Sequence, residues 1–304
     1  MIYRVAQISD THLSRDKPFF IANFERVAAA LVAAVPDLVL NTGDVSLDGA
    51  IEEGDLQEAR RMHEAIRLPM RFIPGNHDVG ECHDAPASAE PRISAATRER
   101  YLRHFGDDYW RMDIPGWRLV AVNALLLGSD LEAAAAQLDF LAQAAATSGA
   151  RRIALFVHKP LFDASPEETA VTGRFVNPPT RRRLQEALGG GDLGLVASGH
   201  VHQYRATLTA GIRHVWAPST GFIMPDARQP RYGEKDVGYV EHSFQPDGGH
   251  QARYVRVPGL ERHDHHGFPG GLPGPALSTT GSGAAAAGAA GCRARARGHP
   301  CGGS

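Results

Sequence analysis

The chain has 304 residues, of which 43% are hydrophobic and 22% are charged, which is the composition of an ordinary globular protein with a substantial core. Its 32 Lys and Arg against 34 Asp and Glu leave a formal net charge of −2, which argues against a nucleic-acid polymer as an obligatory partner. No run of about 18 or more apolar residues is present, so no membrane span is expected. Three cysteines make no disulfide framework, and the N-terminus lacks the basic start and apolar run of a signal peptide. These features predict a cytoplasmic protein.

Short runs rich in Val, Ile and Leu alternate with longer amphipathic segments over the first 200 residues. The runs have the length and the apolar character of strands that are buried on both faces. They comprise residues 5–9, 37–41, 70–73, 118–122, 153–157 and 193–198. The helical patterns between them comprise residues 21–34, 52–66, 94–105, 131–146 and 179–188. This alternation predicts an α/β fold in which helices pack on the faces of a sheet.

The pattern changes after residue 200, where shorter strand patterns follow one another with turns between them. These patterns comprise residues 204–209, 212–216, 238–244 and 252–257, and such meanders usually form antiparallel sheet. We expect them to form a second sheet that packs on the first, with residues 1–260 as one domain. Residues 267–304 contain 11 Gly and 9 Ala and few large apolar side chains, so we expect a disordered tail there.

Five short motifs directly follow predicted strands. They are Asp10-Thr11-His12, Gly43-Asp44, Gly75-Asn76-His77-Asp78, His158 and Gly199-His200-Val201-His202. Ligands of open α/β sheets bind beyond the carboxyl ends of the strands, so motifs that are far apart in the sequence can converge on one rim. Each motif alone occurs often by chance, but all five in this order are specific.

The side chains of these motifs are typical of a metal site. Eight of them offer oxygen or imidazole nitrogen, which suit Mn²⁺, Fe and Zn²⁺: Asp10, His12, Asp44, Asn76, His77, His158, His200 and His202. The absence of cysteine among them argues against structural zinc and against an iron–sulfur cluster. Eight groups are too many for one ion that keeps an open position, but they suit two ions about 3.5–4 Å apart that share a carboxylate.

The series of motifs resembles that of the calcineurin-like metallophosphoesterases, and the resemblance extends over about residues 3–257. It implies the fold of that family, a four-layer αββα sandwich of two mixed β-sheets flanked by helices. Within the family the chain is most similar to the bacterial class III cyclic-nucleotide phosphodiesterases, through residues 9–13, 43–49 and 137–141. It departs from the family pattern where Lys159 follows His158 and where Gln203 follows the last motif.

The resemblance also implies a role for each residue of the motifs. Two metal ions, which would be Mn²⁺, Fe²⁺ or Fe³⁺, or Zn²⁺, would share Asp44. The first ion would take Asp10, His12, Asp44 and His202, and the second would take Asp44, Asn76, His158 and His200. His77 would contact the phosphate and act as a general acid, and Asp78 would orient His77. The expected substrate contacts are Asn76, His77 and His202.

The activity that follows is hydrolysis of small phosphodiesters, 3′,5′-cyclic nucleotides among them, by a hydroxide that bridges the two ions. The ions would neutralise the phosphate and lower the pKa of the bound water. A phosphomonoesterase or a nucleotide pyrophosphatase on the same metal site is the alternative, and a non-catalytic scaffold is a third reading. The expected partner is a small phosphodiester, without a nucleic-acid polymer or a membrane; a homo-oligomer is left open.

Other side chains have ordinary explanations in the sequence. His63 and residues 181–183 are expected on solvated helix faces, and Cys82 is expected to be a packed or loop thiol. Residues 172–177 lie between the fourth and fifth motifs and are a candidate substrate-contacting loop. Residues 221–225 either line the same mouth or pack in the core or a loop.

Overall fold

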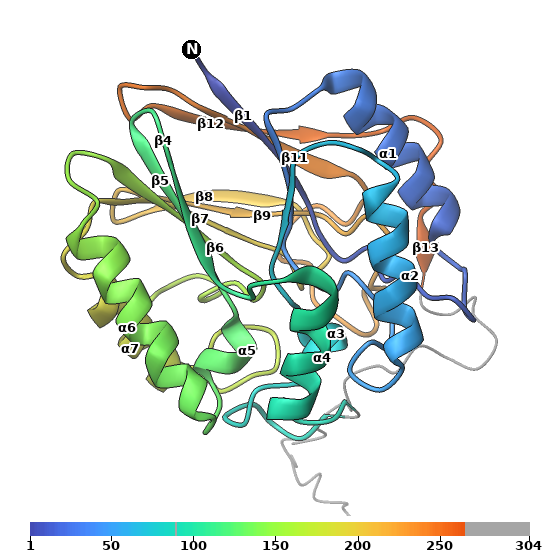
Figure 1. Ribbon diagram of the computed structural model, residues 1–304, viewed down its shortest axis with the longest axis horizontal. Helices are drawn as coiled ribbons and strands as arrows, with labels where there is room; N and C mark the ends of the chain where they lie inside the picture. Colours follow the sequence, from blue (N-terminus) through green and yellow to red (C-terminus); the bar gives the residue numbers. More distant parts are fainter. Residues whose placement is uncertain (89, 265–304) are drawn as a thin grey trace, which may run out of the picture.

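The computed structural model describes residues 1–88 and 90–264, so the predicted tail of residues 267–304 lies outside the described part of the chain. Most of the strands belong to two mixed sheets (Figure 1). The five-stranded sheet has the order β12-β11-β1-β2-β3. Its strands are β1 (Tyr3–Ile8), β2 (Leu38–Asn41), β3 (Met70–Phe72), β11 (Tyr239–Phe244) and β12 (His250–Val255). Strands β1, β2 and β3 are parallel, and β11 and β12 join them in antiparallel pairing.

The six-stranded sheet has the order β4-β5-β6-β7-β9-β8. Its strands are β4 (Trp110–Ile114), β5 (Trp117–Val122), β6 (Arg152–Val157), β7 (Leu193–Ser198), β8 (Arg205–Thr209) and β9 (Ile212–Trp216). The four central strands are parallel, and the edge strands β4 and β8 are antiparallel to their neighbours. A short parallel ladder joins β10 (Phe222–Ile223) to β13 (His263–Asp264).

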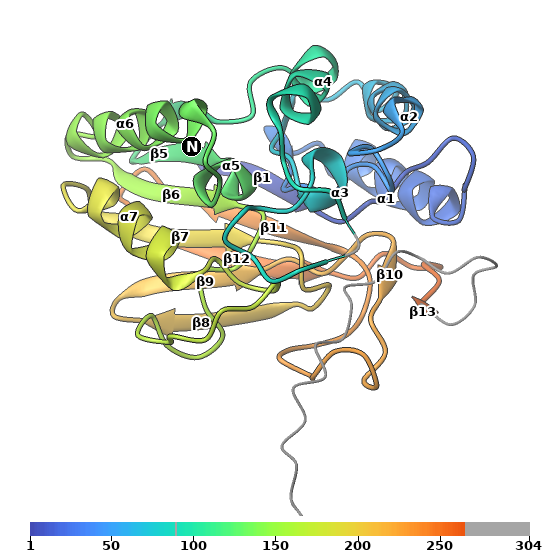
Figure 2. The same ribbon diagram turned by 90° about the horizontal axis from the view of Figure 1, so that it is seen from below.

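Helices cover the outer sides of the two sheets (Figure 1, Figure 2). They are α1 (Ile21–Ala34), α2 (Glu53–Glu64), α3 (Asn76–Val79), α4 (Ala95–Phe105), α5 (Ala124–Leu127), α6 (Glu132–Ala146) and α7 (Pro178–Leu188). Helices α6 and α7 lie side by side against the six-stranded sheet, and α1 and α2 lie with the five-stranded sheet. This arrangement confirms the predicted α/β sandwich of two mixed sheets flanked by helices. Within the described residues, every helix is too short or too polar to cross a bilayer.

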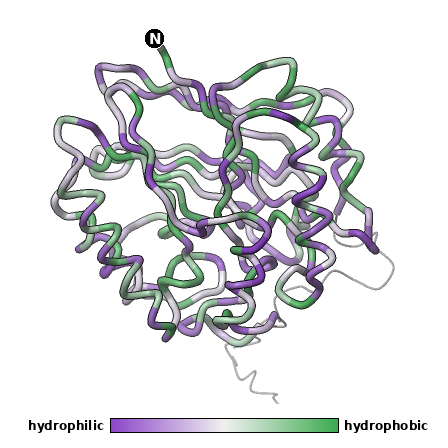
Figure 3. The backbone as a smooth tube through the Cα atoms, viewed as in Figure 1, coloured by the Kyte–Doolittle hydropathy of each residue, from purple (hydrophilic) through white to green (hydrophobic). Residues whose placement is uncertain are grey.

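The alternation of side chains along the strands produces two cores. Val5 on β1 faces the other sheet and belongs to a cluster with Trp117 and Phe156, whereas its neighbour Ala6 belongs to the cluster that includes Phe24 of α1. Both faces of the central strands are therefore covered, which is why most of their side chains are apolar. Figure 3 shows the hydrophobic stretches in the central strands, while the helices alternate between hydrophobic and hydrophilic residues.

The prediction that the C-terminal strands build a second sheet of their own is wrong. Strands β8 and β9 extend the sheet of β7, and β11 and β12 extend the sheet of β1. The β-α units before residue 200 are themselves divided, with β1 to β3 in one sheet and β4 to β7 in the other. Strands that are apolar on both faces need cover on both sides, and here helices cover one side and the other sheet covers the second. Strand β4 was not predicted at all, although Pro115-Gly116 before β5 is a turn signal.

Candidate metal centre

All five motifs lie at the carboxyl ends of strands and meet between the two sheets. Strand β1 is followed by Asp10 and His12, β2 by Asp44, β3 by α3 with Asn76, His77 and Asp78, β6 by His158, and β7 by His200 and His202. The ends of β1 and β7 are joined across the sheets, because Gln7 Nε2 donates to Ser198 O at 3.1 Å and His200 N donates to Asp10 Oδ2 at 3.0 Å.

The candidate ligand atoms form two groups that share Asp44. Within each group, ligand atoms of all members lie within 4.8 Å of one another. The first group is Asp10, His12, Asp44 and His202, and the second is Asp44, His158 and His200. Asn76 adjoins the second group, with Oδ1 3.2 Å from His158 Nε2. The structure thus brings together all seven predicted ligands, and a buried cluster of this kind could hold metal.

Backbone carbonyls fix the protonation of two of the histidines. His158 Nδ1 donates to Thr42 O at 2.8 Å, and His202 Nδ1 donates to Phe222 O at 3.0 Å. A neutral imidazole carries one proton, so Nε2 of each ring presents a lone pair. His158 Nε2 lies 3.3 Å from Asp44 Oδ2, where a protonated ring pairs with the carboxylate and a neutral ring turns a lone pair toward it.

Two further pairs of histidine ring nitrogens lie close together in the cluster. His200 Nε2 donates to Gly173 O at 2.9 Å, so its Nδ1 lone pair faces His158 Nε2 at 3.2 Å. His12 Nε2 and His202 Nε2 lie 3.3 Å apart. With neutral rings whose free nitrogens point into the cluster, as in metal ligation, lone pairs face lone pairs and carboxylates, and a cation between them removes the repulsion. The donor set therefore fits metal ions.

The backbone of the ligands is held in an uncommon conformation. Five of them have positive φ angles: Asp10 (53°), His12 (46°), Asp44 (51°), His200 (68°) and His202 (53°). This left-handed conformation costs on the order of 1 kcal/mol or more for a residue with a side chain, and its concentration in a site points to function.

Glycines allow the loops of the site to approach one another. A Cβ added to Gly43, whose φ is +107°, would lie 2.5 Å from His158 Nδ1, and a Cβ on Gly75 would collide with the side chain and backbone of Asp44. These two positions therefore accept only glycine.

Burial and nearby charges determine the protonation of the cluster. Burial lowers the pKa of His158, but the charges of Asp44 and Asp10 and the hydrogen bond to Asp44 raise it to about 9. Burial holds the pKa of His12 and His200 well below the ordinary value, with additional lowering by the nearby positive charge of His77 and Lys159 respectively. Burial alone would raise the pKa of Asp44, but His158 and His77 hold it well below its usual range. Neutral imidazoles and an ionised carboxylate are the forms that bind metal.

His77 lies beside the ligand groups with its ring anchored by the backbone. Its Nδ1 donates to Leu47 O at 2.7 Å, and its backbone N donates to Asp44 Oδ1 at 2.9 Å. Burial lowers the pKa of His77, but the charges of Glu90 and Asp44 raise it to about 9. The ring therefore favours the protonated form.

Asp78 does not orient His77 as predicted. Its carboxylate accepts hydrogen bonds from Ser46 N at 2.9 Å, Ser46 Oγ at 2.6 Å, Val45 N at 3.2 Å and Gly75 N at 2.8 Å. Burial and the charge of Asp44 raise the pKa of Asp78 to about 6. Asp78 thus joins the loop that carries Asp44 to the loop that carries Asn76, and the Leu47 carbonyl takes the expected place beside His77.

Three further acidic and basic groups of the site were not found from the sequence. Glu90 Oε2 accepts from Asn76 Nδ2 at 2.5 Å, and Glu90 Oε1 lies 3.3 Å from His77 Nε2. Lys159 Nζ forms an ion pair with Glu81 Oε1 at 2.5 Å, and both side chains are buried. The two glutamates come from the loop after α3, where no periodic pattern points to them; Lys159 was noticed only as a departure from the family pattern.

His63 also differs from its prediction, because it is fully buried rather than solvated. Its Nδ1 donates to Ala59 O at 2.7 Å, so its Nε2 accepts from Asn41 Nδ2 at 3.1 Å. Asn41 Oδ1 in turn accepts from Gly43 N at 3.0 Å, next to Asp44. His63 falls on the same helical stripe as Ala59, which is a signal that could have identified it.

The loops predicted at the mouth of the site contribute backbone atoms to it. Gly173 O holds His200, and Phe222 O holds His202. Arg181, expected in solvent, is buried. Substrate contact by residues 172–177 stays a prediction.

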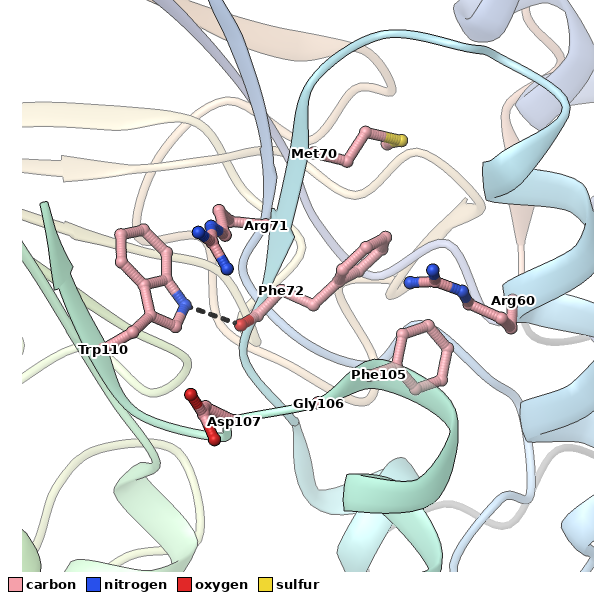
Figure 4. A pocket seen from close by; sticks show the side chains of 8 residues that line it. All are labelled: Arg60, Met70, Arg71, Phe72, Phe105, Gly106, Asp107 and Trp110. Atoms are coloured by element: carbon pink, nitrogen blue, oxygen red, sulfur yellow. Dashed lines mark hydrogen bonds between the residues drawn. The ribbon is translucent and has the colours of Figure 1, made fainter.

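A separate pocket of about 340 Å³ contains none of these residues. Its lining residues are Arg60, Met70, Arg71, Phe72, Phe105, Gly106, Asp107 and Trp110. Figure 4 shows Trp110 Nε1 donating to Phe72 O, at 2.9 Å, across this pocket. Its location at β3 and β4 is apart from the carboxyl-end loops that carry the metal ligands.

Residues 3–204 match the family model of the calcineurin-like phosphoesterases, so the chain belongs to that family and the predicted membership is confirmed. The 3′,5′-cyclic adenosine monophosphate phosphodiesterase CpdA of Pseudomonas aeruginosa is 27% identical over 228 residues, which cover 71% of this chain and 75% of that protein. The serine/threonine-protein phosphatase CPPED1 of Danio rerio is 24% identical over 181 residues, which cover 56% of this chain and 55% of that protein.

Solved structures show the same fold. The purple acid phosphatase PPD1 from yellow lupin (Lupinus luteus) seeds superimposes with a TM-score of 0.60 at 16% identity, covering 87% of this chain and 53% of that one. By the family-model match the chain is a phosphoesterase, in a hydrolase class that typically uses divalent metals.

Proposed function

We propose that this chain is a dinuclear metal-dependent phosphodiesterase that acts on small phosphodiesters, with 3′,5′-cyclic nucleotides as the first candidates. The observation that carries the proposal is the pair of buried ligand groups sharing Asp44, with the His77 ring beside them. The sequence likeness to a cyclic adenosine monophosphate phosphodiesterase supports the choice of substrate class.

The proposed metal ligands form two sets, one for each ion. Asp10, His12, Asp44 and His202 would hold one ion, and Asp44, Asn76, His158 and His200 would hold the other. When bound, Mn²⁺, Fe or Zn²⁺ would supply the positive charge that neutralises a phosphate and lowers the pKa of water.

His77 would supply the proton for the leaving oxygen. The Leu47 carbonyl fixes its Nδ1 proton, so Nε2 is the nitrogen that faces the site. An alkoxide is a poor leaving group, and a positioned acid typically accelerates its departure by about 10²–10⁴-fold. Asn76, His77 and His202 would contact the phosphate.

A phosphomonoesterase is the second candidate, favoured by the likeness to a protein phosphatase. The metal ligands would be the same. The two activities would differ in the charge of the phosphate that the site accepts, which is larger for a monoester than for a diester. A cytoplasmic location and a small-molecule substrate without a nucleic-acid polymer belong to the same proposal and rest on the composition of the chain.

The test compares initial rates on bis(p-nitrophenyl) phosphate and p-nitrophenyl phosphate with Mn²⁺-reconstituted protein. The proposal expects a clear preference for the diester, followed by hydrolysis of cyclic nucleotides. Asp44→Asn is the control, because loss of the shared carboxylate should remove both activities if they arise at this site. A preference for the monoester would favour the phosphatase, and no hydrolysis of either ester by metal-loaded protein would contradict both candidates.

A further inference from the structure

A carboxylate of the chain itself lies against two of the side chains that would receive the substrate phosphate. Glu90 Oε2 accepts from Asn76 Nδ2 at 2.5 Å, and Glu90 Oε1 lies 3.3 Å from His77 Nε2. The side chain of Glu90 is only 12% exposed. A phosphate oxygen and a carboxylate oxygen are both anionic acceptors, so they compete for the same donors.

The backbone around Glu90 is pinned, which holds the carboxylate in this place. Glu81 N donates to Pro91 O at 2.8 Å, and Ile93 N donates to Glu81 O at 2.8 Å. Arg92 Nη1 donates to Cys82 O at 2.6 Å and so ties the two arms of the loop together.

The ion pair of the same loop secures it to the metal centre. Glu81 pairs with the buried Lys159, the residue next to the predicted ligand His158. The ion-pair partner of Glu90 in the described part of the chain is the His77 ring. Glu90 therefore adds a negative charge at the edge of the phosphate site.

We propose that Glu90 is a specificity-determining residue that selects phosphodiesters over phosphate monoesters by charge. This inference rests on the proposed function of the site. A diester carries one negative charge, whereas a monoester carries close to two above its second pKa of about 6. Repulsion by a fixed carboxylate grows with the charge of the substrate, so the monoester is penalised more.

The expected size of the effect follows from the interaction of single charges in a partly buried site. One additional negative charge a few ångströms from a carboxylate lowers affinity on the order of tenfold, since the effective dielectric constant lies between those of protein and water. Removing the charge of Glu90 should change the relative preference for the two esters by that factor.

The experiment compares wild type with Glu90→Gln, Glu90→Asp and Glu99→Gln, all metal-loaded at pH 8. Glu90→Gln removes the charge, Glu90→Asp keeps it, and Glu99→Gln makes the same chemical change at an exposed position on α4. Metal content is measured for each variant. Two quantities are then determined: the ratio of kcat/KM for p-nitrophenyl phosphate to that for bis(p-nitrophenyl) phosphate, and the calorimetric Kd of inorganic phosphate relative to dimethyl phosphate.

We expect Glu90→Gln to raise the ratio of kcat/KM for the monoester to that for the diester about tenfold. Binding of phosphate relative to dimethyl phosphate should tighten by a similar factor. Glu90→Asp should stay closer to wild type than Glu90→Gln, and Glu99→Gln should match wild type. An unchanged ratio, or an equal loss on both esters, would overturn charge selection and leave Glu90 as a group that only orients Asn76.

The calorimetric arm separates this inference from the proposed function. If the wild type hydrolyses neither ester, the proposed function is wrong, but a tighter relative affinity for phosphate in Glu90→Gln would still support charge selection by Glu90. If the wild type hydrolyses both esters and neither ratio responds to Glu90→Gln, the charge-selection inference alone is wrong. If neither anion binds to any of the proteins, both are wrong.

Discussion

Among single residues, His77 differs from its neighbours because its ring would move a proton rather than hold a metal. We expect His77→Ala to retain its metal and to lose about 10²–10⁴-fold in rate on a dialkyl phosphodiester, whose leaving alkoxide needs a proton. The loss should be much smaller on bis(p-nitrophenyl) phosphate, because nitrophenolate leaves without one. Initial rates on both esters, with metal analysis of the same samples, test this.

Two results would count against that role. Equal losses on the two esters would mean that His77 positions the phosphate without protonating the leaving oxygen. Loss of metal from His77→Ala would mean that the backbone contact of His77 with Asp44 depends on the ring.

Lys159 and Glu81 form a buried ion pair whose partners depend on each other. We expect Glu81→Gln to lower the free energy of unfolding by about 3–5 kcal/mol, because the Lys159 ammonium is then buried without a counter-charge. Replacing both at once, as Glu81→Leu with Lys159→Met, should recover much of the loss, since an apolar pair needs no such charge. Denaturant unfolding of Glu81→Leu, Lys159→Met and the double variant, beside Glu81→Gln, measures the coupling; additive losses would show that the pair is not coupled.

The residues of the site were predictable to different degrees, for a physical reason. Metal ligands such as Asp44 and His158 follow apolar strands, so short motifs place them at one rim. Glu81 and Glu90 lie in a loop whose path is set by the backbone hydrogen bonds between Glu81 and Pro91, and no sequence period encodes that path. Asp78 was recognised, but its partners depend on how two loops approach each other.

At the scale of elements, Arg181 on α7 holds the segment that connects β6 to α7. Its Nη1 donates to Leu161 O at 2.9 Å, and its Nη2 donates to Glu168 O. The same segment presents Gly173 O to His200 Nε2. Arg181 thus fixes the backbone that orients a predicted ligand, although it lies outside the metal centre.

We expect Arg181→Met to weaken binding of the second metal ion by on the order of tenfold, because groups that orient ligands typically contribute 10–100-fold to metal affinity. Arg182→Met is the matched control, since Arg182 is exposed on the same helix. Calorimetric titration of Mn²⁺ into metal-free protein measures both sites. Equal weakening by the two substitutions, or by neither, would show that the segment is held without Arg181.

Elements were easier to predict than their assembly. The runs that became β5 and β6 are largely apolar stretches, and their existence follows from burial on both faces. Which sheet each strand joins depends on contacts between distant segments, such as the pairing of Val5 on β1 with His242 on β11. The sequence pattern identifies the strands after residue 200 without specifying that they are shared between two sheets.

At the scale of the whole molecule, a chain of hydrogen-bonded polar side chains crosses the apolar core between the sheets. His250 Nε2 donates to His242 Nδ1 at 3.0 Å, His242 Nε2 donates to Gln7 Oε1 at 2.9 Å, and Gln7 Nε2 donates to Ser198 O. Each ring must be neutral for this order of donors and acceptors. Burial accordingly holds the pKa of His242 well below the ordinary value and lowers that of His250 to about 3.

Such buried neutral histidines make the fold sensitive to acid. Burial lowers the pKa of His63 and of His214 to about 4, whereas an unfolded chain protonates its histidines below about 6.5. The unfolded state therefore binds more protons between these values, and the stability that is present above pH 6.5 is lost as the pH falls. Each group should contribute about 1–2 kcal/mol to the loss between pH 7 and pH 5.

His214→Phe isolates one of these contributions. His214 packs against the Phe162 ring with centroids 4.8 Å apart, and burial is the cause of its lowered pKa, so an apolar ring of similar shape suits the position. We expect the variant to match wild type near pH 7.5 and to be more stable by about 1–2 kcal/mol at pH 5, because it has one fewer proton to take up on unfolding. Denaturant unfolding of metal-free protein at both pH values tests this, since protonation of metal-bound ligands is then excluded. A pH dependence parallel to that of wild type would mean that His214 is already solvated in the folded chain.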